Sequence, residues 1–371
     1  MVKPIYMQIY ECLKDAIYLG VYKQGSKIPS EKELAEEWNV SVITSRKALD
    51  MLREEDIIVR HAGKGSFVNG TNKPVQNEKV EKKPLIGVIM TDFNESFGIG
   101  LLDGIEQSVE GKANFLFRRS FGDLEREQRC IKEFLDQGVD GFIILPSHST
   151  HFNSAILQLV VDDFPLVLID RYLKGLGTIA VGTNNVKAAV EGTEYLFNLG
   201  HETITLLSSP SSYAVAIEDR IEGFKKAFHD RGLPTENLSI ITEITSTLPT
   251  SFNEENVKDD IERIKIHLAN NKDITAIIAL EYNIALLARR AISELGLKCP
   301  EDISILCFDS PPPKPGSFSF THILQDQINI GSTAVNKLLE AQVTEVEKEI
   351  ILFDANIVEG ESTKKVNTVK A

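Results

Sequence analysis

The sequence has few of the features that mark secreted, membrane-embedded or metal-bound proteins. It contains four cysteines in 371 residues, and none of them forms a CxxC pair, so we expect neither a disulfide framework nor a zinc site. No apolar run reaches the length needed to cross a membrane, and charges interrupt the apolar residues near the N-terminus. These absences predict a cytoplasmic protein with buried or incidental thiols.

The sequence also lacks the short motifs of common nucleotide-binding and hydrolytic enzymes. It has no Walker A loop and no GxSxG elbow, and helix packing explains the glycines of GIGLLDG better than a dinucleotide-binding loop does. The histidines of HSTH (148–151) have no carboxylate at ligand spacing nearby. We therefore expect no catalytic site, no cofactor and no bound metal.

Charge is divided unevenly along the chain. Residues 1–84 hold 14 basic and 12 acidic residues, which leaves 26 basic and 42 acidic residues for the remainder out of totals of 40 and 54. Such an acidic body does not favour binding to nucleic acid along its whole length. Attraction to phosphate acts locally, however, so a small, nearly neutral N-terminal head can still bind DNA.

A polar segment with two prolines separates two different sequence patterns. Before it the pattern is helical and ends in a short basic hairpin, and after it short apolar strands alternate with amphipathic helices. Segments of this composition are typical of exposed linkers. The sequence therefore predicts a head at residues 1–70, a linker at 71–84 and a body at 85–371.

The head has the pattern of three helices followed by a β-hairpin. Apolar residues at helical spacing mark residues 5–19, Ser30 and Glu33 have the spacing of a capping box, and Ser41 can cap a third helix. Lys64, in the AGKG turn of the hairpin, can contact phosphate or the minor groove, although that turn alone could be any solvated hairpin. The full order is typical of a winged helix-turn-helix, an α+β fold that reads the major groove.

Residues 4–69 resemble the DNA-binding domain of the gluconate-repressor (GntR) family. The resemblance lies in PIYMQIYECLKDAI, IPSEKELA, the Val-Ser pair and GKGSFV. By this resemblance, the residues expected against double-stranded operator DNA are Ser30, Lys32, Ser41, Thr44, Arg46, Lys64 and Gly65.

Two positions of the head depart from the family pattern. The family usually has arginine where this chain has Lys32 and Val42. Lysine keeps a charge for phosphate but lacks the planar fork that pairs with guanine. Val42 can contact a thymine methyl group or nothing, so Arg46 becomes the first candidate for a polar contact with DNA. The alternative is that Arg46 is a solvated helix arginine.

The body has the pattern of two α/β lobes of similar length. Short apolar runs such as LIGVIM, GFIILP and PLVLID alternate with amphipathic helices, which is typical of parallel sheets covered on both faces. Ligands of such folds bind between the lobes, beyond the carboxyl ends of the strands. The residues that we expect at an effector site there are Phe97, Ser147, Asp170, Arg171, Arg220, Glu281 and Asp309.

The acids and arginines of this set suit a neutral, polyhydroxylated ligand. Carboxylates accept hydrogen bonds from neighbouring hydroxyls, arginines donate them, and an aromatic ring such as that of Phe97 can cover the apolar face of a sugar. A strongly anionic ligand would favour fewer acids. For each residue the alternative is a structural salt bridge or a loop cap.

The body resembles the effector domains of the lactose-repressor family and the related periplasmic sugar-binding proteins. The matching stretches include FPLVLIDR, DRIEGFKKAF, LGLKCPEDISILCFD and THILQDQ, and they run across nearly all of residues 85–340. By this resemblance, the residues that contact the sugar are Asp170, Arg171, Arg220, Asp309 and Gln325. Glu281 and Tyr282 stand where the family commonly has Asn-Asp, which puts the identity of the sugar in doubt.

Together these patterns predict a sugar-responsive transcription regulator that is a homodimer and represses carbohydrate-utilisation genes. A sugar between the lobes would change their closure and, through it, the spacing of two heads on a palindromic operator. Two alternatives are a transport-type solute-binding protein, which would need an export signal and no head, and an enzymatic body fused to the same head. The enzyme would need a Schiff-base lysine beside a phosphate-binding loop.

Overall fold

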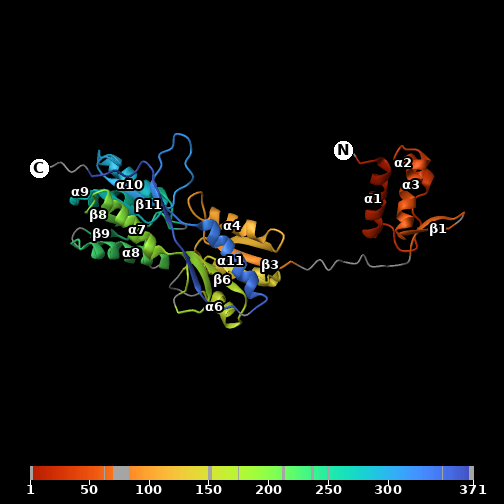
Figure 1. Cartoon of the computed structure of the whole chain (residues 1–371), viewed down its shortest axis with the longest axis horizontal. Coiled ribbons are helices and arrows are strands. Elements are labelled where there is room, and N and C mark those ends of the chain that lie inside the picture. The colour runs from red at the N-terminus through yellow and green to blue at the C-terminus, as the bar shows by residue number, and fades with distance from the viewer. Residues whose placement is uncertain are drawn as a thin grey trace. The chain divides into compact units, whose positions relative to one another are not determined.

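The computed structural model divides into two compact units, Met1–Lys82 and Lys83–Ala371 (Figure 1). The expected linker at 71–84 lies outside the described residues except for its last two positions, and HSTH is described only at its first histidine. No helix in the described part of the chain is long and apolar enough to cross a membrane. The residues that the structure describes are 3–61, 63–69, 83–148, 153–173, 175–210, 214–234, 238–248, 251–344 and 346–366.

The first unit, the head, consists of three helices and an antiparallel hairpin. Its elements are α1 (Ile5–Tyr18), α2 (Glu31–Glu37), α3 (Val42–Glu54), β1 (Ile58–His61) and β2 (Gly65–Val68). The predicted capping box opens α2, because the Ser30 hydroxyl accepts from the Glu33 amide and the Glu33 carboxylate accepts from the Ser30 amide. The predicted winged helix-turn-helix is confirmed.

A small core holds the head together. Ile9 of α1, Leu49 of α3 and Val68 of β2 belong to one buried apolar cluster. The buried Ser45 hydroxyl of α3 donates to the carbonyl oxygen of Glu31 at 2.7 Å and so ties α3 to the start of α2. The head therefore has packing of its own.

The second unit contains two sheets of six strands each, which we call the N-lobe and the C-lobe. The N-lobe sheet has the order β13-β7-β6-β5-β3-β4, and all its neighbouring strands are parallel. Its strands are β3 (Leu85–Met90), β4 (Asn114–Arg119), β5 (Gly141–Ile144), β6 (Leu166–Ile169), β7 (Ile179–Thr183) and β13 (Ile350–Phe353). Its helices are α4 (Ile99–Val109), α5 (Leu124–Asp136), α6 (Ser154–Val161) and α11 (Gln327–Ala341).

The C-lobe sheet has the order β14-β12-β11-β10-β8-β9, with only β14 antiparallel to its neighbour. Its strands are β8 (Ile204–Leu207), β9 (Leu238–Ile241), β10 (Ala276–Ala279), β11 (Ser304–Phe308), β12 (Thr321–Leu324) and β14 (Asn356–Val358). Its helices are α7 (Asn185–Asn198), α8 (Val215–Arg231), α9 (Glu254–Asn270) and α10 (Tyr282–Glu294). The predicted pair of parallel α/β lobes is confirmed.

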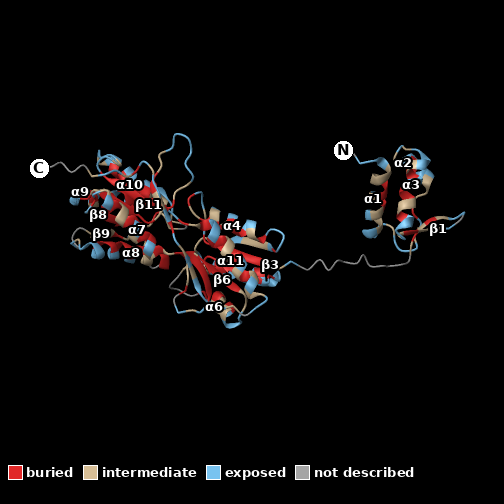
Figure 2. Ribbon diagram, in the orientation of Figure 1, coloured by how far each residue is buried: buried red, intermediate tan, exposed pale blue. Residues whose placement is uncertain are grey.

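Both sheets are buried on their two faces, as Figure 2 shows by the red strands between helices with pale outer sides. Successive residues of a strand point to opposite faces. Val88 and Ile89 accordingly enter different core clusters of the N-lobe, and Ile277 and Ile278 enter different clusters of the C-lobe. This explains why the strands appear in the sequence as continuous apolar runs.

The chain passes between the two lobes three times, after β7, after β12 and after β13. The second crossing delivers α11 to the N-lobe, where it lies beside α4 (Figure 1). A Cβ atom on Gly104 would lie 2.2 Å from the carbonyl oxygen of Ile328, and one on Gly331 would lie 2.2 Å from that of Leu101. Close helix packing therefore accounts for the last glycine of the GIGLLDG segment.

Because each unit has its own core, we expect Leu49→Ala to weaken only the head. Removing this buried side chain should lower the free energy of unfolding of the head by about 3 kcal/mol. Calorimetry of the full chain should show the transition of the head shifted downward and that of the body unchanged. Leu338→Ala, in the N-lobe core, should instead lower the transition of the body and leave that of the head unchanged. A joint shift of both transitions by Leu49→Ala would contradict separate cores.

Candidate effector cleft and DNA-facing surface

A cleft of about 640 Å³ lies between the N-lobe and the C-lobe, at the carboxyl ends of the strands of both sheets. This volume is in the range of small-molecule sites. All the residues predicted for the effector site line it: Phe97, Ser147, Asp170, Arg171, Arg220, Glu281, Asp309 and Gln325. The structure therefore brings together every residue of that set, although they are spread over more than 220 positions of the sequence.

Arg220 is the most firmly held charge in the cleft. It lies on α8 with 6% of its surface exposed. Its Nε donates to Asn185 Oδ1 at 2.7 Å, and its Nη1 donates to the carbonyl oxygen of Leu280 at 2.9 Å. The guanidinium carbon lies 3.9 Å from the centroid of the Phe308 ring. These contacts fix the guanidinium before any ligand arrives.

Three acids surround Arg220 and compensate its charge. Burial lowers the pKa of Arg220, and the negative charges of Asp309, Asp170 and Glu281 oppose that shift. Burial also raises the pKa of each of the three acids, while Arg220 lowers it. For Asp309 the pKa is raised to about 7. The cleft therefore holds more negative charge than Arg220 alone can stabilise.

Asp170 and Asp309 occupy corresponding positions in the two lobes. Each follows directly after a buried strand, β6 or β11, and each has a left-handed backbone, with φ of 62° and 59° respectively. Residues other than glycine rarely adopt this conformation, and they do so mainly where the surrounding structure holds them at functional sites. The two turns aim one acid from each lobe into the cleft.

Several buried polar atoms of the cleft have no hydrogen-bond partner among the described residues. Gln325 Nε2 donates to Asp309 Oδ2 at 2.6 Å, but Asp309 Oδ1 and Gln325 Oε1 are unpaired. Arg171 Nε and Ser246 Oγ have no hydrogen-bond partner either, although Arg171 Nε lies 3.7 Å from Asp170 Oδ2 in an ion pair. Because unpaired buried polar groups cost free energy, a ligand with both donors and acceptors would stabilise this cleft.

Arg171 and Ser147 serve partly to hold one loop of the cleft. Arg171 Nη1 donates to the carbonyl oxygens of Pro146 and Ser147 at 3.1 and 2.9 Å. The hydroxyl of Ser147 lies 2.9 Å from that of Ser120. The hydroxyl of Ser147 is therefore used to hold the loop, as in the structural alternative to a sugar contact. Arg171, in contrast, has an Nε without a hydrogen bond.

Two fully buried acids that the sequence analysis missed hold the loops that line the cleft. Glu127 of α5 accepts from the Ser147 amide at 2.7 Å, and Asp260 of α9 accepts from the Ser246 amide at 2.7 Å. Burial raises the pKa of Glu127, and the hydrogen bond from the Ser147 amide lowers it. Both acids lie on amphipathic helices, where the sequence does not distinguish a buried acid from a solvated one.

Other residues of the cleft were missed although the same reasoning about strand ends would have found them. Asp92, Phe121 and Ser209 follow β3, β4 and β8 and line the cleft. The Ser209 hydroxyl donates to Glu281 Oε1 at 3.0 Å. Since this bond lowers the pKa of Glu281 against the effect of burial, Ser209 helps to keep that carboxylate in the cleft.

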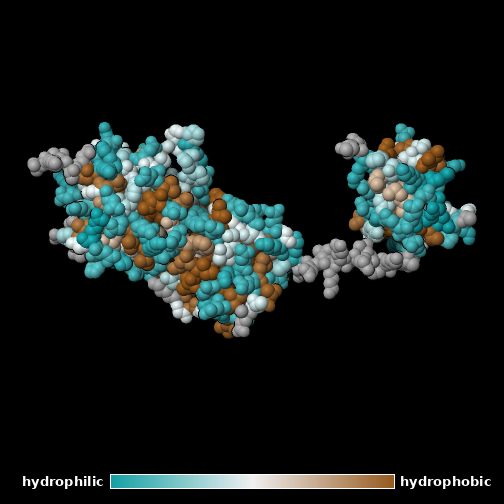
Figure 3. Space-filling model, viewed as in Figure 1, coloured by the Kyte–Doolittle hydropathy of each residue, from teal (hydrophilic) through white to brown (hydrophobic). Residues whose placement is uncertain are grey.

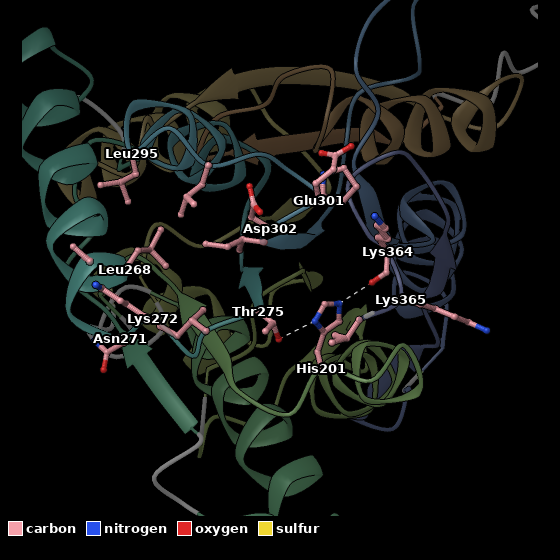
Figure 4. A pocket seen from close by; sticks show the side chains of 16 residues that line it. His201, Leu268, Asn271, Lys272, Thr275, Leu295, Glu301, Asp302, Lys364 and Lys365 are labelled. Carbon is pink, nitrogen blue, oxygen red and sulfur yellow. Dashed lines mark hydrogen bonds between the residues drawn. The ribbon is translucent and has the colours of Figure 1, made fainter. Parts of the chain in front are cut away.

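A second hollow, of about 580 Å³, lies at the opposite ends of the C-lobe strands (Figure 4). There His201 Nδ1 lies 2.9 Å from the Thr275 hydroxyl oxygen, and Nε2 lies 2.9 Å from the carbonyl oxygen of Lys364. None of its described lining residues has a buried side-chain polar atom without a partner. His201 therefore anchors the C-terminal segment, and this hollow lacks the chemistry of the cleft.

In the head, two of the residues predicted to contact DNA also cap helices. Ser30 caps α2, and Ser41 caps α3 by accepting from the Thr44 amide at 3.2 Å. The Ser41 and Thr44 hydroxyls lie 2.9 Å apart. Since the N-terminus of a helix is a favourable site for phosphate, these capping residues lie where a DNA backbone could bind.

The other predicted DNA contacts lie on the surface of the head. Lys32 on α2 and Lys64 at the tip of the hairpin are exposed, and Gly65 begins β2 with a φ of +113°. Val42 is 36% exposed at the first position of α3.

Arg46 forms a surface ion pair. Its Nε donates to Glu31 Oε2 at 3.0 Å, and its side chain remains 55% exposed. Arg60 of β1 binds the other oxygen of Glu31 at 2.9 Å. Exposed pairs of this kind contribute only about 0.2–1 kcal/mol, so phosphate can displace Glu31 from Arg46 at little cost.

Two family models match the chain. Residues 5–68 match the bacterial regulatory proteins of the gntR family, and residues 193–363 match the periplasmic binding protein-like domain. The chain joins a GntR-family domain to a periplasmic-binding-protein-like domain. Both resemblances seen in the sequence are thereby confirmed.

Relatives of the chain share this organisation or parts of it. The chain is 28% identical to an arabinose metabolism transcriptional repressor of Halalkalibacterium halodurans, over 98% of each chain. It is 27% identical to the crystal structure of a LacI family transcriptional regulator from Enterococcus faecium with bound ribose, with a TM-score of 0.61 over 76% of this chain and 100% of that one. The crystal structure of the lac repressor dimer bound to operator shares the fold. It is 21% identical to this chain, with a TM-score of 0.62 over 79% of this chain and 99% of that one.

The raised pKa of Asp309 has a consequence for stability. Because its pKa of about 7 in the folded protein exceeds its ordinary value of 3.8, the ionised carboxylate destabilises the fold. The loss of stability is absent below about pH 4, grows as the pH rises and is complete above about pH 7. We therefore expect Asp309→Asn to raise the Tm of the ligand-free protein at pH 8 and to change it little at pH 4.

Thermal denaturation at both pH values checks this expectation. Asp273→Asn, which removes an exposed acid of the same lobe, controls for the loss of one negative charge and should leave the Tm unchanged at both. A lower Tm for Asp309→Asn at pH 8 would contradict the expectation that ionised Asp309 destabilises the fold.

Proposed function

We propose that the protein is a sugar-responsive repressor of transcription that binds operator DNA as a homodimer. The observation that carries this proposal is the cleft. It gathers every predicted effector residue, and several of these residues have buried polar atoms without a hydrogen-bond partner among the described residues. The GntR-family domain at residues 5–68 supplies the means of binding DNA. A transport-type solute-binding protein would have no use for this domain.

The chemistry of the cleft supports a neutral sugar as the effector. A hydroxyl can donate to Asp309 Oδ1 or Gln325 Oε1 and can accept from Arg171 Nε, so adjacent hydroxyls satisfy both kinds of unpaired atom. The ring of Phe97 lines the same cleft and can cover the apolar face of a sugar. An anionic ligand would instead meet the three acids Asp170, Glu281 and Asp309.

The relatives indicate which sugars to test first. One is named as a repressor of arabinose metabolism, and the Enterococcus regulator binds ribose in its crystal structure. Both are named as regulators of transcription and neither as an enzyme, which supports a regulator over an enzymatic body. Pentoses therefore lead the panel of candidate effectors.

The contacts of the cleft support a route from sugar binding to lobe closure. Arg220 binds Asn185, which follows the first crossing between the lobes, and Gln325 stands at the second. Two residues on, Gln327 accepts from the Gly98 amide at 2.8 Å, and its Nε2 lies 3.3 Å from the carbonyl oxygen of Ser96. A sugar that binds the closed arrangement better would shift the lobes toward it, and in a dimer this would move the two heads relative to the operator half-sites.

A thermal-shift screen of the full chain tests the effector. We expect one or a few neutral sugars, with L-arabinose and D-ribose in the panel, to raise the Tm, because a ligand at 100 times its Kd stabilises by about 2.7 kcal/mol. Arg220→Lys should lose this response, since lysine cannot reproduce the fork that binds Asn185 and the Leu280 carbonyl.

Two variants complete that screen. Asp309→Asn, which we expect to be well folded, should also lose the response, and Arg129→Lys, at an exposed arginine of α5, should keep it. If no sugar changes the Tm, or if Arg220→Lys responds as the unchanged chain does, the effector site is wrongly assigned.

A gel-shift assay tests the DNA-facing surface. The duplex is one enriched from a random library by the full chain. Arg46→Ala should reduce retention of this duplex at least tenfold, as expected from the loss of a charged phosphate or base contact in both half-sites. Arg53→Ala is the matched control, because Arg53 lies on the same helix with a similar exposure of 49%, and it should bind normally.

Further measurements on Arg46→Ala separate a role in DNA contact from a role in folding. Arg46→Ala should keep its sugar-dependent rise in Tm, because the sugar binds in the other unit. Loss of DNA retention together with a lowered unfolding transition of the head would mean that Arg46 supports folding of the head instead of contacting DNA.

A further inference from the structure

The outward face of α3 begins with apolar residues. Ile43 is 76% exposed, and its neighbour Val42 is 36% exposed. The buried stripe of the helix consists of Ser45, Ala48, Leu49 and Leu52. At 100° per residue, Ile43 lies almost opposite the middle of that stripe. Its side chain therefore points away from the core of the head.

Among the described residues, Ile43 takes no part in the core of the head that would explain an isoleucine at this position. It is not among the residues that form or contact the core cluster of the head. β-Branched residues are also weaker helix formers than alanine or the long polar residues that commonly occupy exposed helix positions. Isolated exposed apolar residues are ordinary on proteins, so the meaning of this one depends on its surroundings.

Those surroundings are the basic part of the helix. Arg46 and Lys47 stand three and four residues further on, next to Ile43 on the same face. The Arg46 side chain is 55% exposed, and Lys47 Nζ lies 3.8 Å from the centroid of the Tyr6 ring. In the space-filling view, apolar atoms are exposed on the head near α2 and α3 (Figure 3). An apolar contact flanked by cations suits a groove lined by phosphates.

We propose that Ile43, with Val42 beside it, reads the C5 methyl group of a thymine in each half-site of the operator. The inference rests on the proposed function, in which the head binds duplex DNA through α3. Among the groups on base-pair edges in the major groove, the thymine methyl is the apolar one. Ile43 can bury this methyl, whereas the donors and acceptors of a G·C pair would lose water against it without gaining a partner.

Replacing thymine by deoxyuridine tests the proposal because it removes only the methyl group. The full chain first selects a duplex from a random library, and each thymine of that duplex is then replaced in turn. We expect one thymine in each half-site at which the replacement weakens the Kd about fourfold, the effect of burying one methyl-sized group. Replacing both should weaken it about fifteenfold if the half-sites are independent.

Variants of the protein identify the side chain that senses the methyl group. Ile43→Ser should bind the thymine and deoxyuridine duplexes equally, and in a new selection it should lose the preference for thymine at that position. Leu19→Ser is the matched control, because Leu19 is an aliphatic residue of the head with 82% exposure, outside α3. It should keep the full difference between the two duplexes.

The outcomes separate this proposal from the proposed function. If no duplex is enriched, the DNA-binding function fails, and the methyl contact with it. If a duplex is enriched but no deoxyuridine replacement weakens binding, or if Ile43→Ser keeps the discrimination, only the methyl contact is overturned. A change in the oligomeric state of Ile43→Ser without a change in base preference would make Ile43 a protein contact and would also overturn it.

Discussion

The body of this protein depends on one buried cation. The guanidinium of Arg220 is held by Asn185, by the carbonyl of Leu280 and by the ring of Phe308. Without it, Asp309 would lose the positive charge that lowers its pKa, and Asp170 and Glu281 would keep only the charge of Arg171 as compensation. With it, the acids are tolerated but remain incompletely satisfied, since burial still raises their pKa. The cleft is therefore stable enough to fold and polar enough to favour a ligand rich in hydroxyls.

The same cation links the ligand site to the path of the chain between the lobes. Arg220 contacts Asn185 at the start of the C-lobe, and the loops of the cleft are held by Glu127 in one lobe and Asp260 in the other. These loops consequently have little freedom to rearrange around a sugar by themselves. Ligand binding is more easily accommodated by a movement of one whole lobe against the other, because each lobe is a close-packed body.

Much of this arrangement follows from sequence patterns, and the exceptions have physical reasons. Parallel strands end at one edge of a sheet, so residues after strands, such as Asp170 and Asp309, could be assigned to one cleft. The same rule would also have found Asp92 and Ser209. Glu127 could not be found in this way, because an acid on an amphipathic helix is the usual pattern of a solvated surface. Ile43 could have been recognised from the phase of α3, whose buried stripe was evident from Ala48, Leu49 and Leu52.

The three crossings between the lobes have a consequence for how the protein is made. The N-lobe is assembled from residues 85–183 together with α11 and β13, which follow most of the C-lobe in the sequence and therefore leave the ribosome after it. Its sheet therefore stays uncovered by α11 until most of the C-lobe has been synthesised. The head, which is continuous in sequence and has its own core, can fold long before that, since domains fold as units during synthesis. A chain interrupted before residue 327 would consequently release a folded head attached to a body whose N-lobe lacks α11 and β13.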